Sequence, residues 1–511
     1  MTDMTTSIPD HTTLLIVGAG PSGLVAALSL VHHGFKDFVI VDAVEEGENT
    51  SRAIVIHAAT LEVRHYHLLP ITIPDHICHR LDQALDTIGC GEDIVAKGTK
   101  VRKINIGNRS SQLLSTDLSS LDKHTHHPYA LVIPQNLTEF ILGEKVKDCG
   151  VTVHRPCKVT SLKTNDKDDQ LTDVTFENGK NITAKYVVGA DGARSVVCIL
   201  LIYFYSLLLN LFQVRQMAGI SFVDPKTGEQ GDRVTNLAQM VLADVVYEGK
   251  DHDLGFLSTM SPESFFLSMP MPHSFNELLA MKGQFVEGQI CRIGSGVPLT
   301  DGEIPHSPNK EYLQNLIDRF GPAILASDAS VNPSSTSVRI KEVVWSTRFR
   351  THSAIADKFF TRLGGDELED AAIATSVPYT TSRHGGIILL IGDAAHIHSP
   401  AGGQGMNLGI RDAVFLGEAI SKHINASASQ PSTVDTDHIL REFAEVRHKR
   451  ALEVIAFTKT LLSVAGAQDK NISWMLPISA VTVRDWMVWL GGKLGFMQAR
   501  MAWAMSGLGR R

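Results

Sequence analysis

"TTLLIVGAGPSGLVAALSLVHHGFKDFVIVDA", residues 12–43, predicts how the chain begins to fold. Residues 14–17 form a short apolar run of the kind found in buried parallel strands. Residues 24–31 are apolar and helix-forming, and residues 38–41 form a second short apolar run. This order predicts a strand, a helix and a second strand, which together make a βαβ unit.

Three glycines join the first strand to the helix. Gly18, Gly20 and Gly23 have the spacing G-x-G-x-x-G, and Asp42 ends the second strand. Gly18 permits a tight turn, Gly20 lets a pyrophosphate approach the backbone, and Gly23 lets helix and strand pack closely. The helix amino terminus favours phosphate, and a carboxylate in the position of Asp42 accepts ribose hydroxyls. The stretch therefore predicts a Rossmann-like dinucleotide site, without distinguishing FAD from NAD.

Length and composition limit the number of domains and the kinds of partner. The whole chain has 511 residues and exceeds the roughly 250–300 at which a single core stops growing, so at least two domains are expected. The net charge of −8 and the lack of a basic block argue against a nucleic-acid partner. Six scattered cysteines without metal or redox spacing, and a polar start without a signal core, predict a cytoplasmic protein.

Two later motifs narrow the choice of cofactor. "YVVGADGARSVV" begins at Tyr186, where a β-rich run leads into Asp191 and its neighbouring glycines. "ILLIGDAAHIHSPAGGQGMNLGIRDAVFLGEAI" begins at Ile388, as a strand followed by Asp393 and a glycine-rich turn that opens a helix. Asp393 can hydrogen-bond a polyol, and the amides of residues 403–407 can hold negative charge at a helix start.

The three motifs together resemble those of the class A flavoprotein aromatic monooxygenases, of the para-hydroxybenzoate and phenol hydroxylase type. The resemblance runs from about residue 14 to 411 and implies FAD as the cofactor. It implies contacts with FAD from the glycine turn and further residues along the chain. These are Gly18, Gly20, Gly23, Asp42 at the adenosine ribose, Arg52, Gln135, Asp191 and Arg194 in a motif shared with NADPH, Asp393 at the ribityl chain, and Pro400, Gly403, Gln404, Gly405, Met406 and Asn407 at the isoalloxazine.

The expected fold class is α/β: a Rossmann-like FAD-binding domain, an antiparallel β-sheet substrate domain and a helical C-terminal region. Residues 215 to about 360 lack the βαβ rhythm and alternate in short apolar runs, which favours an antiparallel sheet. The last amphipathic stretch, "DWMVWLGGKLGFMQARMAWAM", is expected to be buried, with a membrane-surface role as the alternative. The expected ranges are 1–100, 130–197 and 386–425 for the FAD-binding domain, 101–129 and 214–385 for the substrate domain, and 426–511 for the C-terminal region.

Two segments interrupt the resemblance. Residues 63–83 and 197–213 separate phrases that join directly in relatives, and each begins with Val and ends with Gln, as GT…CAG codons would give. The hypothesis is that both are retained introns, in a protein of fungal secondary metabolism. The second lies in an uncharged run, residues 196–214, whose length matches the roughly 20 residues of a membrane helix. Membrane attachment through this run, and an inactive mis-spliced product, are the alternatives.

The resemblance implies an oxidoreductase in which NADPH or NADH reduces FAD and O2 is used to hydroxylate an aromatic small molecule. Epoxidation and Baeyer–Villiger insertion are alternative outcomes, whereas the W-x-W-x-I-P signature of flavin halogenases is absent. Phenol hydroxylases have an acidic residue where Ile54 stands, so the catalytic base is unassigned and His57 is the nearest candidate. His396 and His398 are expected to be structural, with no metal bound. The sequence does not predict an oligomeric state.

Overall fold

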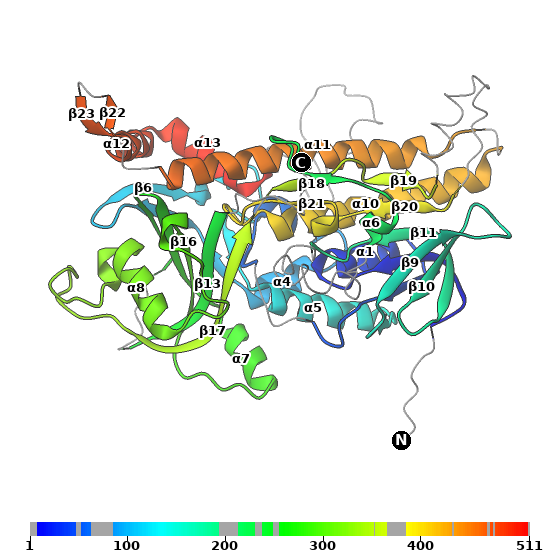
Figure 1. The fold of residues 1–511 in the computed structure, drawn as a ribbon, viewed down its shortest axis with the longest axis horizontal. Coiled ribbons are helices and arrows are strands. Elements are labelled where there is room, and N and C mark those ends of the chain that lie inside the picture. Colours follow the sequence, from blue (N-terminus) through cyan, green and yellow to red (C-terminus); the bar gives the residue numbers. More distant parts are fainter. Residues whose placement is uncertain are drawn as a thin grey trace.

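The computed structural model describes most of the chain, which forms two large sheets, three small ones and helices packed around them (Figure 1). Arg52, Arg194 and nearly all of the two expected inserts lie outside the described residues. The described residues are 8–47, 53–62, 85–193, 213–229, 238–248, 255–351, 353–364, 385–431, 434–467, 471–473 and 476–508.

The first sheet has eight strands and confirms the Rossmann-like prediction. Its central path runs β19-β20-β11-β1-β2-β8, with β9 and β10 attached antiparallel beside β11. The pairs β1–β2, β1–β11, β11–β20 and β2–β8 are parallel. The strands are β1 (His11–Val17), β2 (Phe38–Val41), β8 (Val153–His154), β9 (Val159–Thr164), β10 (Thr172–Phe176), β11 (Asn181–Gly189), β19 (Phe360–Arg362) and β20 (Ile387–Leu390).

Helices cover this sheet. Helix α1 (Pro21–His32) forms where the sequence places Pro at the start and an apolar run after it, and seven consecutive apolar or small residues of it, 24–30, are buried. It packs against α10 (Gly405–Ser429) and α5 (Gln135–Asp148), and α10 packs in turn against the long α11 (His438–Ala465). These contacts form the main hydrophobic core.

The second sheet has seven strands in the order β17-β13-β16-β15-β14-β5-β6, antiparallel except at β14–β5. Its strands come from two separate stretches of the chain, residues 103–117 and 238–351. One face packs on α8 (Lys310–Phe320), while α7 (His273–Met281) lies over the other. The strands are β5 (Lys103–Gly107), β6 (Gln112–Asp117), β13 (Ala238–Tyr247), β14 (Leu257–Ser261), β15 (Ser264–Pro270), β16 (Ile290–Val297) and β17 (Ile340–Thr351).

The chain returns to the first sheet earlier than the expected boundary at residue 386. Strand β19 pairs with β20, and β18 (Ala354–Ala356) joins β12 (Phe222–Val223) and β21 (His396–Ile397). Strands β12, β18, β19 and β21 are two or three residues long, too short for a periodic signal in the sequence. Another small sheet contains β3 (Val55–Ile56), β4 (Thr99–Val101) and β7 (Ala130–Val132). Among the described residues, the remaining short helices are α2 (Ala58–Leu61), α4 (Gly91–Lys97) and α6 (Val214–Met217), with 3-10 turns η1 (Leu118–Leu121), η3 (Leu299–Asp301), η4 (Ala323–Leu325) and η5 (Gly392–Ala394).

The C-terminal region contains α11, which runs along the length of the molecule, and a hairpin and two helices at one end of it (Figure 1). The hairpin is β22 (Asn471–Ser473) with β23 (Leu476–Ser479), followed by α12 (Ala480–Lys493) and α13 (Gly495–Ser506). Burial of the last amphipathic stretch was the wrong expectation, because most of its large apolar side chains are exposed. None of the described helices has the length and apolar character needed to span a membrane.

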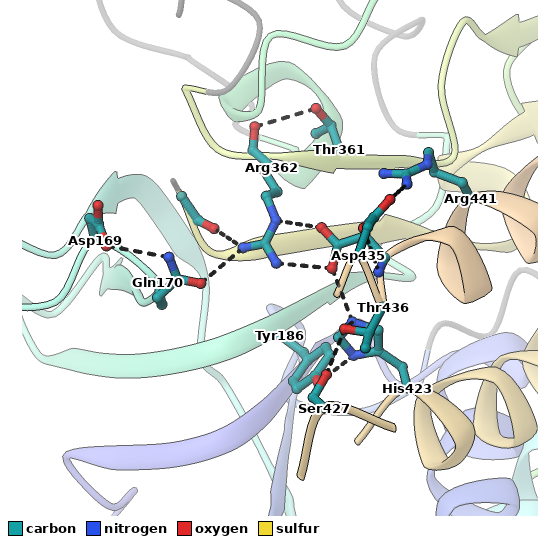
Figure 2. A network of polar contacts seen from close by, with 12 residues as sticks. Asp169, Gln170, Tyr186, Thr361, Arg362, His423, Ser427, Asp435, Thr436 and Arg441 are labelled. Carbon is teal, nitrogen blue, oxygen red and sulfur yellow. Dashed lines mark hydrogen bonds and ion pairs between the residues drawn. The ribbon is translucent and has the colours of Figure 1, made fainter. Parts of the chain in front are cut away.

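A buried polar network connects helices α10 and α11 to strands β11 and β19 of the first sheet (Figure 2). Tyr186 Oη lies 2.8 Å from His423 Nδ1, and His423 Nε2 lies 3.0 Å from Asp437 Oδ1. Arg362 donates to both oxygens of Asp437, at 2.6 and 3.0 Å. Burial opposes ionisation of Asp437, but these donors hold its pKa below the usual value. The network therefore joins β11, β19, α10 and α11.

The residues on either side of each expected insert contact one another. Leu85 N–H donates to Thr60 O at 3.1 Å and Asp86 N–H to Leu61 O at 3.1 Å. At the second junction, Val214 N–H donates to Asp191 Oδ2 at 2.8 Å. Within the described chain, the residues before and after each insert are therefore joined by hydrogen bonds; we call these contacts the closed junctions.

Candidate functional site

The three sequence motifs converge at the carboxyl ends of the parallel strands β1, β11 and β20. A Cβ added to Gly18 would lie 2.2 Å from Ala190 O, so the first and second motifs are in direct backbone contact. A Cβ on Gly392 would lie 2.4 Å from Ser22 Oγ, which places the third motif against the start of α1. This edge is where open α/β sheets bind ligands.

The glycine turn fits a dinucleotide pyrophosphate. Gly18 has φ +106°, which favours glycine, and a Cβ on Gly23 would lie 1.9 Å from Gly18 O. Around Gly20, by contrast, an added Cβ meets nothing within 4 Å. No side chain of the described residues caps the amino end of α1. The space and the amides beside Gly20 therefore suit a phosphate group.

Asp42 lies beside this turn, as predicted, and is already partly engaged. Its Oδ2 accepts from Ala19 N–H at 2.6 Å and its Oδ1 from Val44 N–H at 3.0 Å. Arg155, which sequence reasoning missed, lies 3.5 Å from Asp42 Oδ1 and donates to Ala19 O. A carboxylate has about four acceptor positions, so Asp42 keeps capacity for a ribose hydroxyl.

Asp191 is half-buried at the end of β11. Burial raises its pKa to about 6, against the hydrogen bond from Val214 N–H. Arg215, whose side chain is buried, donates to Ala394 O at 3.0 Å and lies 3.8 Å from the centre of the Phe222 ring. Gln213, assigned by sequence to the second insert, is buried and accepts from Arg215 Nη2 at 2.9 Å. Arg215 therefore connects the second motif to the third.

The glycine-rich turn before α10 is held by one amide side chain. Asn407 accepts from His57 N–H at 2.8 Å and donates to Val55 O and Gly403 O at 2.8 and 2.7 Å. His57 Nε2 lies 2.8 Å from Gly402 O, so this nitrogen carries the proton. Gly402 and Gly403 have φ values of +78° and +61°, which explains why glycine occupies both positions. Gln404, Gly405 and Met406 continue from this turn into α10, and Pro400 precedes it.

Two further predicted residues lie along the same edge. Asp393 is exposed in η5, directly after β20, where its carboxylate is accessible to a ligand. Gln135, at the start of α5, accepts from Ala53 N–H at 3.3 Å and donates to Glu139 at 2.8 Å. Burial raises the pKa of Glu139, despite the hydrogen bond from Gln135. Gln135 therefore supports the strand that follows Arg52.

A buried ion cluster, also missed from the sequence, supports the third motif from behind. Asp412 accepts from Arg447 Nε at 2.7 Å, His396 Nε2 at 2.6 Å and Gly392 N–H at 3.2 Å. Burial alone would raise the pKa of Asp412, but Arg447 and His396 bring it below its usual value. His398 donates to Ser399 O, and burial lowers its pKa to about 4. Among the described residues, no group of three or more His, Cys, Asp or Glu side chains is arranged so that it could hold a metal ion.

The sequence profile of one protein family, described as "FAD binding domain", matches residues 11–66, 79–201 and 347–458. The matched ranges include all three motifs and cover more than half of the chain. The first break in the match, between residues 66 and 79, falls inside the expected insert 63–83.

Several known proteins are similar along most of the chain. A Streptomyces rimosus 12-dehydrotetracycline 5-monooxygenase/anhydrotetracycline 6-monooxygenase is 27% identical over 83% of this chain and 65% of its own length. A Sphingobium chlorophenolicum pentachlorophenol 4-monooxygenase is 23% identical over 84% of this chain and 61% of its own. The chain thus spans just under two thirds of these relatives. The crystal structure of p-nitrophenol 4-monooxygenase from Pseudomonas putida covers 98% of this chain and 99% of its own, at 19% identity and a TM-score of 0.66, which shows the same fold.

Proposed function

The chain belongs to the FAD binding domain family, and from this premise we propose that it is an FAD-dependent monooxygenase acting on an aromatic small molecule. It uses NADPH or NADH and O2 to hydroxylate a phenolic or polyketide-type ring in secondary metabolism. The similar proteins named for tetracycline and pentachlorophenol oxygenation support this substrate class. Four described cysteines are free thiols, which supports a cytoplasmic location.

The observation that carries the proposal is the convergence of the three motifs on one sheet edge. With FAD bound, the glycine turn at Gly18–Gly23 would hold the pyrophosphate, Asp42 the adenosine ribose and Asp393 the ribityl chain. Residues 400–407 would hold the isoalloxazine. When bound there, FAD supplies the redox and oxygen-activating chemistry.

The protein's own residues position this chemistry. Asn407 holds the turn of Gly402 and Gly403 against β3, so its backbone amides keep one orientation. His57 donates to Gly402 O, and we assign it a positioning role in place of a catalytic one. Ile54 is buried among apolar side chains, so its position supplies apolar surface and no base. The sheet carrying Met269 and Ile290 packs against Ile54, which helps to exclude water.

We also propose that residues 63–83 and 197–213 are retained introns that the working enzyme lacks. The closed junctions at Thr60–Leu85 and Asp191–Val214 support this, because the residues that flank each segment bond directly to one another. Sequencing of mature transcripts tests the idea, and messages that all encode these residues would rule it out.

The test of the function uses purified protein with and without the two segments. We expect bound flavin, slow NADPH oxidation alone and much faster oxidation with the right aromatic, whose mass rises by one oxygen. Gly403→Val is the matched probe, because Val55 Cβ lies 3.4 Å from an added Cβ and φ is positive. It should raise the hydrogen peroxide formed per NADPH consumed. A flavin-free protein, or one that leaves every phenolic and polyketide substrate unchanged, would contradict the proposal.

A further inference from the structure

The C-terminal helices carry a concentrated apolar surface. Eight of the seventeen large apolar side chains that are exposed in the described chain lie between residues 486 and 503. Trp486 is 63% and Phe496 is 68% exposed. We call this set the C-terminal apolar face; it consists of Trp486, Met487, Trp489, Leu490, Leu494, Phe496, Met497 and Trp503.

The face lies on one side of each helix. In α12, residues 486, 489, 490 and 493 recur at helical spacing and share one side. In α13 the same holds for residues 496, 500 and 503. The opposite sides pack inward: a Cβ on Gly492 would lie 2.9 Å from Leu113 O, and Ala502 and Leu508 are buried beside Ala58 and Ala59. The exposed side is therefore oriented by the fold and directed away from the core.

The charges on this face are of one sign. Lys493 and Arg500 are exposed, and Lys493 Nζ lies 5.6 Å from the centre of the Trp489 ring. Asp485 is the one carboxylate on the described α12 and α13, and it bonds to Arg484 and Asn108. A second copy of the chain would bring the same two cations together without an acidic partner from these helices. An anionic surface complements them, although the whole chain has a net charge of −8.

From this surface we propose that α12 and α13 dock the protein on the surface of an anionic lipid membrane. Trp, Phe, Met and Leu enter the boundary between headgroups and acyl chains, where tryptophan is favoured, and Lys493 and Arg500 contact the lipid phosphates. The helices lie in the plane of the membrane, since neither is long enough to cross it. Helices α12 and α13 lie at one end of the molecule (Figure 1).

Flotation of the full chain with phosphatidylcholine vesicles, with and without phosphatidylserine, tests the proposal independently of any enzyme activity. We expect the protein to float with the anionic vesicles, and the Trp emission to shift to the blue. Three of the five tryptophans lie on this face. The triple variant Trp486→Ser, Trp489→Ser, Phe496→Ser should lower the bound fraction at least tenfold. Lys493→Gln and Arg500→Gln should each weaken binding about fivefold, and less at high salt.

Phe285→Ser is the matched control, because Phe285 is 83% exposed elsewhere on the surface. It should float like the unchanged protein. Flotation that survives the triple variant comes from another part of the chain and overturns the proposal, as does a failure to float with either vesicle. A concentration-dependent dimer that the triple variant abolishes, without vesicle binding, would show that a second copy covers the face.

Discussion

Replacing Asp412 with Asn should cost the protein about 3–5 kcal/mol of unfolding free energy. The side chain of Asp412 is 1% exposed and that of Arg447 is 3% exposed. Asp412 neutralises Arg447 at 2.7 Å and accepts from His396 at 2.6 Å. The amide of Asn is nearly the same size, so no cavity forms. The cost arises because the Arg447 guanidinium stays buried without a counter-charge.

Denaturant unfolding in saturating FAD measures this cost. Glu418→Gln is the control on the same helix: its partner Lys422 is mostly exposed, so the loss should stay below about 0.5 kcal/mol. The double variant Asp412→Leu, Arg447→Met removes both charges and should recover most of the stability. If Asp412→Asn cost no more than Glu418→Gln, the buried cluster would not support the turn as argued.

Three further outcomes are expected. Asp393→Ala should weaken FAD binding about 10- to 150-fold in a fluorescence titration, through loss of a charge-assisted hydrogen bond, and an unchanged dissociation constant would refute the ribityl assignment. His398 has its pKa lowered by burial from 6.5 to about 4, so the folded state holds it neutral; stability is fully present above pH 6.5 and is lost as pH falls towards 4. His398→Asn should reduce this acid-induced loss of unfolding free energy by up to about 3 kcal/mol. Parallel plots of unfolding free energy against pH for the variant and the unchanged protein would contradict this. Deleting 63–83 and 197–213 together should yield a soluble protein that binds flavin with an undiminished melting temperature, whereas aggregation would show that the segments are needed.

The sequence predicted those parts of the molecule that depend on local pattern. The glycine turn, β1, α1 and β2 follow from spacing and periodicity within a few dozen residues. Arg155 and Arg447 could not be found this way, because each meets its carboxylate only after the chain has folded back from a distant element. Trp486 and its neighbours were misjudged for another reason. An apolar sequence indicates that the side chains tend to leave water. It does not indicate whether they pack against the rest of the same chain or against another surface.

The closed junctions have a consequence for chain continuity. Hydrogen bonds between Thr60 and Leu85, and between Asp191 and Val214, hold the flanking residues together whether or not a peptide bond connects them nearby. The fold can then be regarded as three pieces, residues 8–62, 85–193 and 213–508, that meet by pairing of strands. Such positions accept a graft or a break better than the motifs around them do. An affinity tag or a fluorescent domain inserted at either junction would lie close to the sheet edge where the three motifs meet.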